Sequence, residues 1–113
     1  MNYILFYLLI SHYLFDFTLQ NDATAINKNR HVKTELQKHV PWYYWMISHA
    51  MVHGGGVAFI TGKPILGILE TVCHFIIDCG KCEKWYSIHV DQFLHIACKV
   101  VWVIIYMKAN NLW

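Results

Sequence analysis

The sequence predicts an all-α protein, an up-down bundle of four transmembrane helices in a single domain that spans residues 1–113. The first observation behind this is composition: 57% of the residues are hydrophobic and 14% are charged, whereas a soluble domain has about 45–50% and about 25%. A chain this short has much surface for its volume. It carries too few polar side chains to cover that surface, so we expect a lipid bilayer as its partner. No Lys/Arg cluster is dense enough to indicate nucleic acid.

The second observation is the spacing of the apolar stretches, which predict helices at about 2–20, 42–60, 64–80 and 88–107. Each has about 17–20 residues, enough to cross a hydrocarbon core of about 30 Å. Helices satisfy their own backbone groups in lipid. A soluble bundle is the alternative, but the apolar residues are not confined to the narrow stripe that a soluble helix shows.

The connections fit this order of helices. Residues 21–41 form a polar segment after the first stretch. Gly62 then ends the second helix and Pro64 opens the third, the usual asymmetry of helix ends. Residues 81–87 form a short charged loop before the fourth helix.

Basic residues are unevenly distributed between the two ends of such a bundle. The end that holds both loops carries Lys28, Arg30, Lys33, Lys38, Lys81 and Lys84, and the other end carries Lys63 and Lys108. Because cytoplasmic loops are rich in Lys and Arg, the loop end is predicted to be cytoplasmic and the termini non-cytoplasmic. We expect a bacterial inner membrane.

The third observation is a pair of candidate metal ligands in each predicted helix, four residues apart. The pairs are His12 and Asp16, His49 and His53, His74 and Asp78, and Asp91 and His95. Residues at i and i+4 share one face of a helix, and random placement would give about one such pair in the chain. In antiparallel helices all eight side chains fall at roughly 3–17 Å from the loop end.

This convergence predicts a metal site. An Asp at the centre of a membrane costs about 2.5–3.5 kcal/mol, and a bound cation offsets that cost. Five imidazoles and three carboxylates suit Zn²⁺, as one or two ions, with Mn²⁺ or iron as alternatives. The other interpretation is that the polar groups only cross-link the helices through hydrogen bonds.

Two further features carry reactive side chains. Glu70 precedes His74 by four residues and is a candidate general base, with a structural or proton-relay role as the alternative. Cys79 and Cys82 form a C-x-x-C motif, which can carry thiol redox chemistry or bind metal. We expect structural cysteines, kept reduced if this end is cytoplasmic.

Three segments, 12–20, 74–81 and 91–95, resemble a family of small bacterial and phage membrane proteins of unknown function. The shared patterns are H-x-x-x-D-F-x-x-Q, H-F-x-x-D-x-x-K and D-Q-x-x-H. The resemblance implies a polar set of His12, Asp16, Gln20, His49, His74, Asp78, Lys81, Asp91, Gln92 and His95. From this set we assign Lys81, together with Glu70, to catalysis. The chain is also similar in style to membrane-bound metal-dependent hydrolases.

We therefore expect an intramembrane metal-dependent hydrolase that acts on a lipid or amphipathic substrate near the cytoplasmic face. A di-iron oxidoreductase is one alternative, indicated by the H-x-x-x-H pattern of the second helix. A thiol–quinone redox protein and a non-enzymatic metal-binding or structural membrane protein are the others. The sequence leaves the substrate and the formation of a homo-oligomer open.

Overall fold

The computed structural model describes residues 2–110, which contain helices and no strands, so the all-α prediction is confirmed. The elements are α1 (Asn2–Tyr13), the π-helix η1 (Leu14–Thr18), α2 (Asp22–Asn27), α3 (Glu35–His39), α4 (Trp42–Thr61), α5 (Pro64–Cys82) and α6 (Ile88–Ala109). The long helices therefore begin where the apolar stretches begin. The polar segment 21–41 holds the two short helices.

The first long helix differs from its expected form, because it changes from α to π winding after Tyr13. The amide of Leu19 donates to the carbonyl of Leu14 at 2.7 Å, a bond from i+5 to i. Asp16 is the buried residue of this segment. A π turn holds an extra residue and so changes the direction of the side chains that follow, and such turns are frequent at functional sites.

The ends of the other helices follow local signals in the sequence. Gly62 ends α4 in the left-handed conformation with φ 69°, which suits a residue without a Cβ. Pro64 is the first residue of α5. The Ser87 hydroxyl accepts a hydrogen bond from the Val90 amide at 3.4 Å and caps α6. Asn21 caps α2 in the same way.

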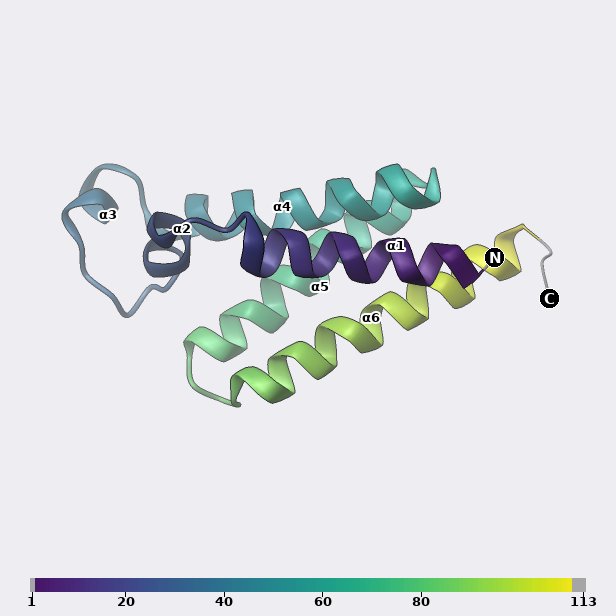
Figure 1. The fold of residues 1–113 in the computed structure, drawn as a ribbon. Coiled ribbons are helices and arrows are strands. Elements are labelled where there is room, and N and C mark those ends of the chain that lie inside the picture. Colours follow the sequence, from purple (N-terminus) through teal and green to yellow (C-terminus); the bar gives the residue numbers. More distant parts are fainter. Residues whose placement is uncertain (1, 111–113) are drawn as a thin grey trace.

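The four long helices form a closed ring (Figure 1): α1 packs against α4 and α6, and α5 packs against the same two helices. The start of α1, the end of α6 and the α4–α5 turn lie at one end. The short helices α2 and α3 lie at the other end. The bundle measures 50 × 25 × 21 Å.

Close packing of α4 on α5 depends on glycine. A Cβ added at Gly54 would lie 2.5 Å from the carbonyl oxygen of Gly67, and one added at Gly67 would lie 2.6 Å from the carbonyl oxygen of Gly54. No side chain fits between the backbones at this point. The two helices therefore approach more closely than larger residues would allow.

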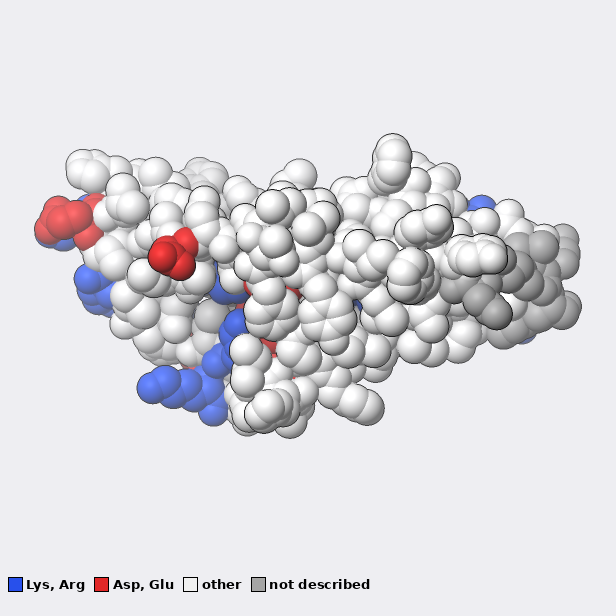
Figure 2. All heavy atoms as spheres, viewed as in Figure 1, with Lys and Arg blue, Asp and Glu red and all other residues white. Residues whose placement is uncertain are grey.

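The bundle is polar inside and apolar outside, which reverses the usual order of a soluble protein. Its apolar core is the small group Leu8, Val57, Leu66 and Trp102. Among the described residues, fourteen polar or charged ones are buried, against seven hydrophobic ones. Large side chains such as Phe59, which is 89% exposed, and Phe93, which is 69% exposed, point outward. Figure 2 shows a largely uncharged face over the long helices, with charged side chains gathered towards the α2–α3 end.

Among the described residues, α6 is the helix that is long and apolar enough to cross a membrane, and residues 3–18 form a shorter apolar helical stretch. This finding does not support the expectation that four helices are each long and apolar enough to cross a membrane. Three charged residues of α5 (Glu70, Asp78 and Lys81) and the imidazoles of α4 lower the hydropathy of those helices. The all-α bundle stands, and four membrane crossings remain a proposal.

Candidate metal centre

Seven of the eight predicted ligands lie in three overlapping groups that could hold a metal ion. The groups are Asp16 with His49, His53 and His74; His12 with His74 and His95; and Asp16 with Asp91 and His95. Within each group the ligand atoms lie within 4.8 Å of one another, and every residue is buried. We call these seven residues the His/Asp cluster. They come from α1, η1, α4, α5 and α6, so all four walls of the bundle contribute.

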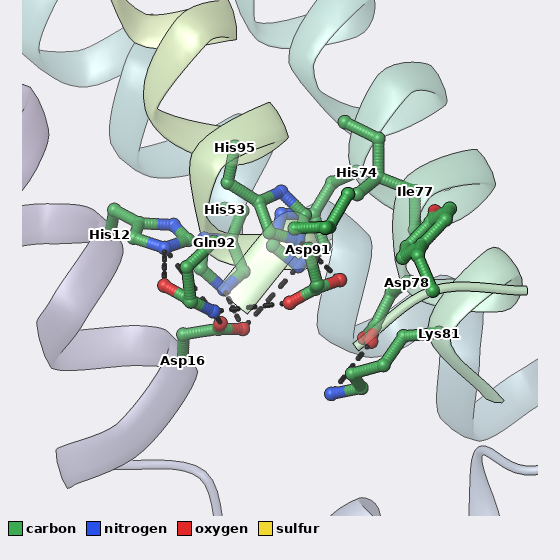
Figure 3. A network of polar contacts seen from close by, with 12 residues as sticks. His12, Asp16, His53, His74, Ile77, Asp78, Lys81, Asp91, Gln92 and His95 are labelled. Carbon is green, nitrogen blue, oxygen red and sulfur yellow. Dashed lines mark hydrogen bonds and ion pairs between the residues drawn. The ribbon is translucent and has the colours of Figure 1, made fainter. Parts of the chain in front are cut away.

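The Asp16 carboxylate faces the imidazoles of the His/Asp cluster (Figure 3). Its Oδ1 is 3.1 Å from His49 Nε2, 3.4 Å from His53 Nε2 and 3.6 Å from His74 Nε2. Its side chain is 6% exposed. One carboxylate oxygen in the π-helical turn thus faces imidazole nitrogens from α4 and α5.

The other oxygen of Asp16 faces α6 and α1. Gln92 Nε2 donates to Asp16 Oδ2 at 2.7 Å, and His12 Nε2 lies 3.7 Å from the same oxygen. His12 Nε2 also lies 2.8 Å from Gln92 Oε1. Because an amide oxygen only accepts, Nε2 of His12 carries the proton, and Nδ1 of the neutral ring keeps a lone pair. Gln92 therefore orients both Asp16 and His12.

The imidazole rings are packed on one another. His53 and His74 stack with centroids 3.7 Å apart, and His74 and His95 stack at 4.1 Å. Two protonated rings at these separations would repel each other strongly in a buried setting. The arrangement therefore suits neutral imidazoles, which are the form that binds metal.

Several buried polar atoms of the cluster make no hydrogen bond to any part of residues 2–110. They include both ring nitrogens of His74 and of His95, Nε2 of His53 and Oδ1 of Asp91. Leaving such a group unsatisfied costs about 1–3 kcal/mol. A divalent cation would accept lone pairs from several of these atoms at once. The donor set of nitrogens and carboxylate oxygens thus fits a metal ion such as Zn²⁺.

A family model described as "Protein of unknown function (DUF3307)" matches residues 4–113. The chain belongs to the DUF3307 family. This match covers nearly the whole bundle and supports the resemblance to a family of unknown function. No curated protein and no solved structure matches the chain. The evidence for the function of this DUF3307 protein therefore lies in its own residues.

The eighth predicted ligand, Asp78, has different neighbours and is in none of the three groups. Its Oδ2 lies 2.6 Å from Lys28 Nζ and 3.4 Å from His49 Nε2. Its Oδ1 lies 3.2 Å from Lys81 Nζ. Two lysines compensate this carboxylate, and through its contact with His49 it can position a candidate ligand.

Lys28 was not predicted to belong to the site. It is 2% exposed and its Nζ also donates to Gln20 Oε1 at 2.8 Å, so it ties α2 to the bundle. In the sequence it is one of several basic residues in the polar segment 21–41, with no local pattern that distinguishes it from Lys33 or Lys38. Only folding brings Lys28 beside Asp78, which lies 50 residues further along the sequence.

The two residues assigned to catalysis lie outside the three groups. Glu70 is fully buried; Lys99 Nζ donates to its Oε1, and Trp102 Nε1 donates to its Oε2 at 3.3 Å. These contacts favour the structural role for Glu70. Lys81 is 27% exposed and pairs with Asp78 at the edge of the site.

The C-x-x-C cysteines are free, partly buried thiols, and neither belongs to a metal-capable group of the described chain. Next to them, Glu83 ties the loop after α5 to the segment between α2 and α3. It contacts Arg30, and its Oε2 lies 2.7 Å from His31 Nε2. Hydrogen bonds from Arg30 and then His31 lower the pKa of Glu83 from 4.5 to about 2.

Proposed function

We propose that this DUF3307 protein is an intramembrane metal-dependent hydrolase that acts on a lipid or another amphipathic substrate near the cytoplasmic face. The single observation that carries the proposal is the His/Asp cluster. Seven buried ligands from four helices, several of whose polar atoms make no hydrogen bond to the described residues, converge where a cation would satisfy them. Ionisable groups buried inside a bundle with an apolar exterior indicate a functional site.

The proposal includes a membrane setting for all four long helices. The exposed side chains of α1, α4, α5 and α6 are largely apolar, and the carboxylates of α5 and α6 turn inward together with Lys99. A lipid solvent accounts for both facts, since large exposed apolar surface is rare on soluble monomers. The α2–α3 end, which is rich in Lys and Arg, would be cytoplasmic and the termini non-cytoplasmic.

Two ions sharing Asp16 fit the ligand groups best. Asp16 is common to the group with His49, His53 and His74 and to the group with Asp91 and His95. Its Oδ1 faces His49 of the first group, and its Oδ2 accepts from Gln92, the residue next to Asp91. Carboxylate and imidazole ligands suit Zn²⁺, with Mn²⁺ or iron as alternatives.

A metal ion in this place would acidify a bound water and polarise an ester or phosphoester group. The chain supplies the rest of the chemistry. Lys81, at the exposed edge, can face a negatively charged head group. Glu70, held by Lys99 and Trp102, supports α5 and α6 behind the cluster.

The proposal is tested with detergent-purified protein and fluorogenic amphipathic esters and phosphodiesters. Turnover should disappear after treatment with a strong chelator and return when Zn²⁺ is added. His53→Ala should lower turnover by at least about 100-fold, the upper end of the loss seen when a residue that merely orients a ligand is replaced. Full turnover after metal removal would overturn the proposal. Bound metal with no turnover on any of these substrates would favour the non-enzymatic metal-binding protein instead.

One observation favours a di-iron oxidoreductase as the second candidate. Asp16 belongs to two of the three ligand groups, and di-iron carboxylate proteins also hold two ions with carboxylates from the helices of a four-helix bundle. That protein would purify with iron and show a charge-transfer absorption band, whereas the hydrolase with Zn²⁺ would show none.

A further inference from the structure

A groove of ≈ 710 Å³ lies between α1 and α4, beside the His/Asp cluster. Its volume falls within the range of about 300–1,000 Å³ that ligand pockets occupy. The lining is apolar apart from two hydroxyls, those of Tyr7 and Ser11, and also includes Phe15, Val52, Gly55 and Phe59. Such a surface accepts an alkyl chain and offers almost nothing to a polar ligand.

Gly55, the middle residue of three consecutive glycines, lines the groove. A Cβ at Gly54 would meet α5, and one at Gly56 would meet the Ser11 hydroxyl, so these two glycines serve helix packing. A Cβ at Gly55 would have no atom within 4 Å. No packing contact requires Gly55 to be glycine, and its missing side chain leaves the groove free.

The groove continues towards the candidate metal centre. Phe15 and Val52 line it and also line a smaller pocket of ≈ 250 Å³, which contains His49 together with polar side chains such as Gln20 and Ser48. The Phe15 ring lies 6.0 Å from the ring of His53. Along the α1–α4 seam the lining therefore becomes more polar towards His49, a member of the cluster.

We propose that this seam binds one amphiphile, with a single alkyl chain in the apolar groove and the polar head in the pocket at His49. The change in polarity along the seam matches the two parts of such a molecule. That the amphiphile is a substrate rests on the proposed function. That it binds here rests on the groove alone. Under the proposed function, the substrate class is then a single-chain ester or phosphoester, and its reacting group lies beside His49.

The test uses protein in phosphatidylcholine nanodiscs and a 16-carbon fatty acid that carries a photoactivatable diazirine on its chain. After irradiation, mass spectrometry of peptides should place the label on residues 7–15 and 52–60. Gly55→Phe should lower this labelling by about tenfold, the loss expected when about two buried methylenes are displaced. Val101→Phe adds the same ring on the outside of α6, where Val101 is 45% exposed, and should leave labelling unchanged.

Label spread evenly over the four long helices, or equal labelling in Gly55→Phe and Val101→Phe, would overturn the proposal in favour of ordinary bilayer lipid. Gly55→Leu serves as the second variant if the phenylalanine variant does not fold. The probe has no bond to hydrolyse, and metal content should stay unchanged in both Gly55 variants. A protein without turnover that still labels in the groove would therefore refute the proposed function and leave this site standing.

Discussion

Glu70 and Lys99 form an ion pair that is almost completely removed from solvent, with Lys99 1% exposed and Glu70 fully buried. Lys99 Nζ also donates to the carbonyl of His95 at 3.4 Å, one turn from the His/Asp cluster. A buried pair contributes little by itself, but an ion left alone after loss of its partner is strongly destabilising. The two residues should therefore behave as a unit in stability measurements.

Lys99→Met should lower the free energy of unfolding by about 3–5 kcal/mol, because it leaves the Glu70 carboxylate uncompensated. The double variant Glu70→Gln with Lys99→Met should lose less than this single variant. Chemical unfolding in detergent measures both. Unchanged stability of Lys99→Met combined with loss of bound metal would contradict the structural role and make the pair part of the metal centre.

Glu83 provides a pH-dependent contact outside the long helices. Its pKa is lowered from 4.5 to about 2, first by Arg30 and then by His31. A carboxyl group whose pKa is lowered on folding stabilises the fold above its unfolded pKa, and this contribution disappears as the pH falls through the folded pKa. The contribution of Glu83 should therefore be complete above about pH 4.5 and vanish towards pH 2.

Thermal unfolding of the wild type and Glu83→Gln from pH 6 down to pH 2 checks this expectation. The wild type should melt at the higher temperature at pH 6, and the difference should shrink to nothing by about pH 2. A difference that is constant over this range would show that the carboxylate charge has no part in holding the loops together.

At the scale of elements, close helix contacts require two of the three consecutive glycines of α4 and do not require the third. Gly54→Ala would place a Cβ 2.5 Å from the Gly67 carbonyl oxygen. Gly55→Ala meets no atom within 4 Å. We expect Gly54→Ala to lower the free energy of unfolding by about 1–3 kcal/mol. Gly55→Ala should raise it by up to about 1 kcal/mol, because alanine favours the helix. Equal effects of the two substitutions would contradict the close α4–α5 contact.

The long helices could be predicted because their signals are local. Apolar length, the Gly62–Pro64 turn and the Ser87 cap are all readable from neighbouring residues. The π-helical segment was not predicted, because its winding depends on which way Asp16 must face in the assembled bundle. The position of the short helix α2 depends on Lys28, whose partner Asp78 lies on α5, so neighbouring residues do not predict it.

At the scale of the whole molecule, an apolar exterior around a charged interior predicts membrane insertion. The protein should stay in the membrane fraction after alkaline carbonate extraction. A cysteine replacing Lys33 should react with a membrane-impermeant maleimide only from the cytoplasmic side, and one replacing Lys63 only from the opposite side. Judged against the wild type, recovery in the soluble fraction or labelling of both positions from one side would contradict the four-crossing bundle.

The convergence of the four ligand pairs could be predicted from helix geometry, since i and i+4 residues share a face and antiparallel helices bring their pairs to one level. The different roles of the carboxylates could not be predicted in this way. Asp78 and Asp16 look alike in the sequence, yet lysines surround one and imidazoles surround the other. Which carboxylate meets a cation and which meets a lysine depends on long-range contacts that spacing does not contain.

The metal content of the purified protein shows whether the His/Asp cluster holds cations. Elemental analysis should find about two divalent ions per wild-type chain. Asp16→Asn, which alters the carboxylate common to two groups, should lose most of this metal, whereas Asp22→Asn, at an exposed position, should retain it. A folded wild-type protein without bound transition metal, or Asp16→Asn with the full content, would contradict the account.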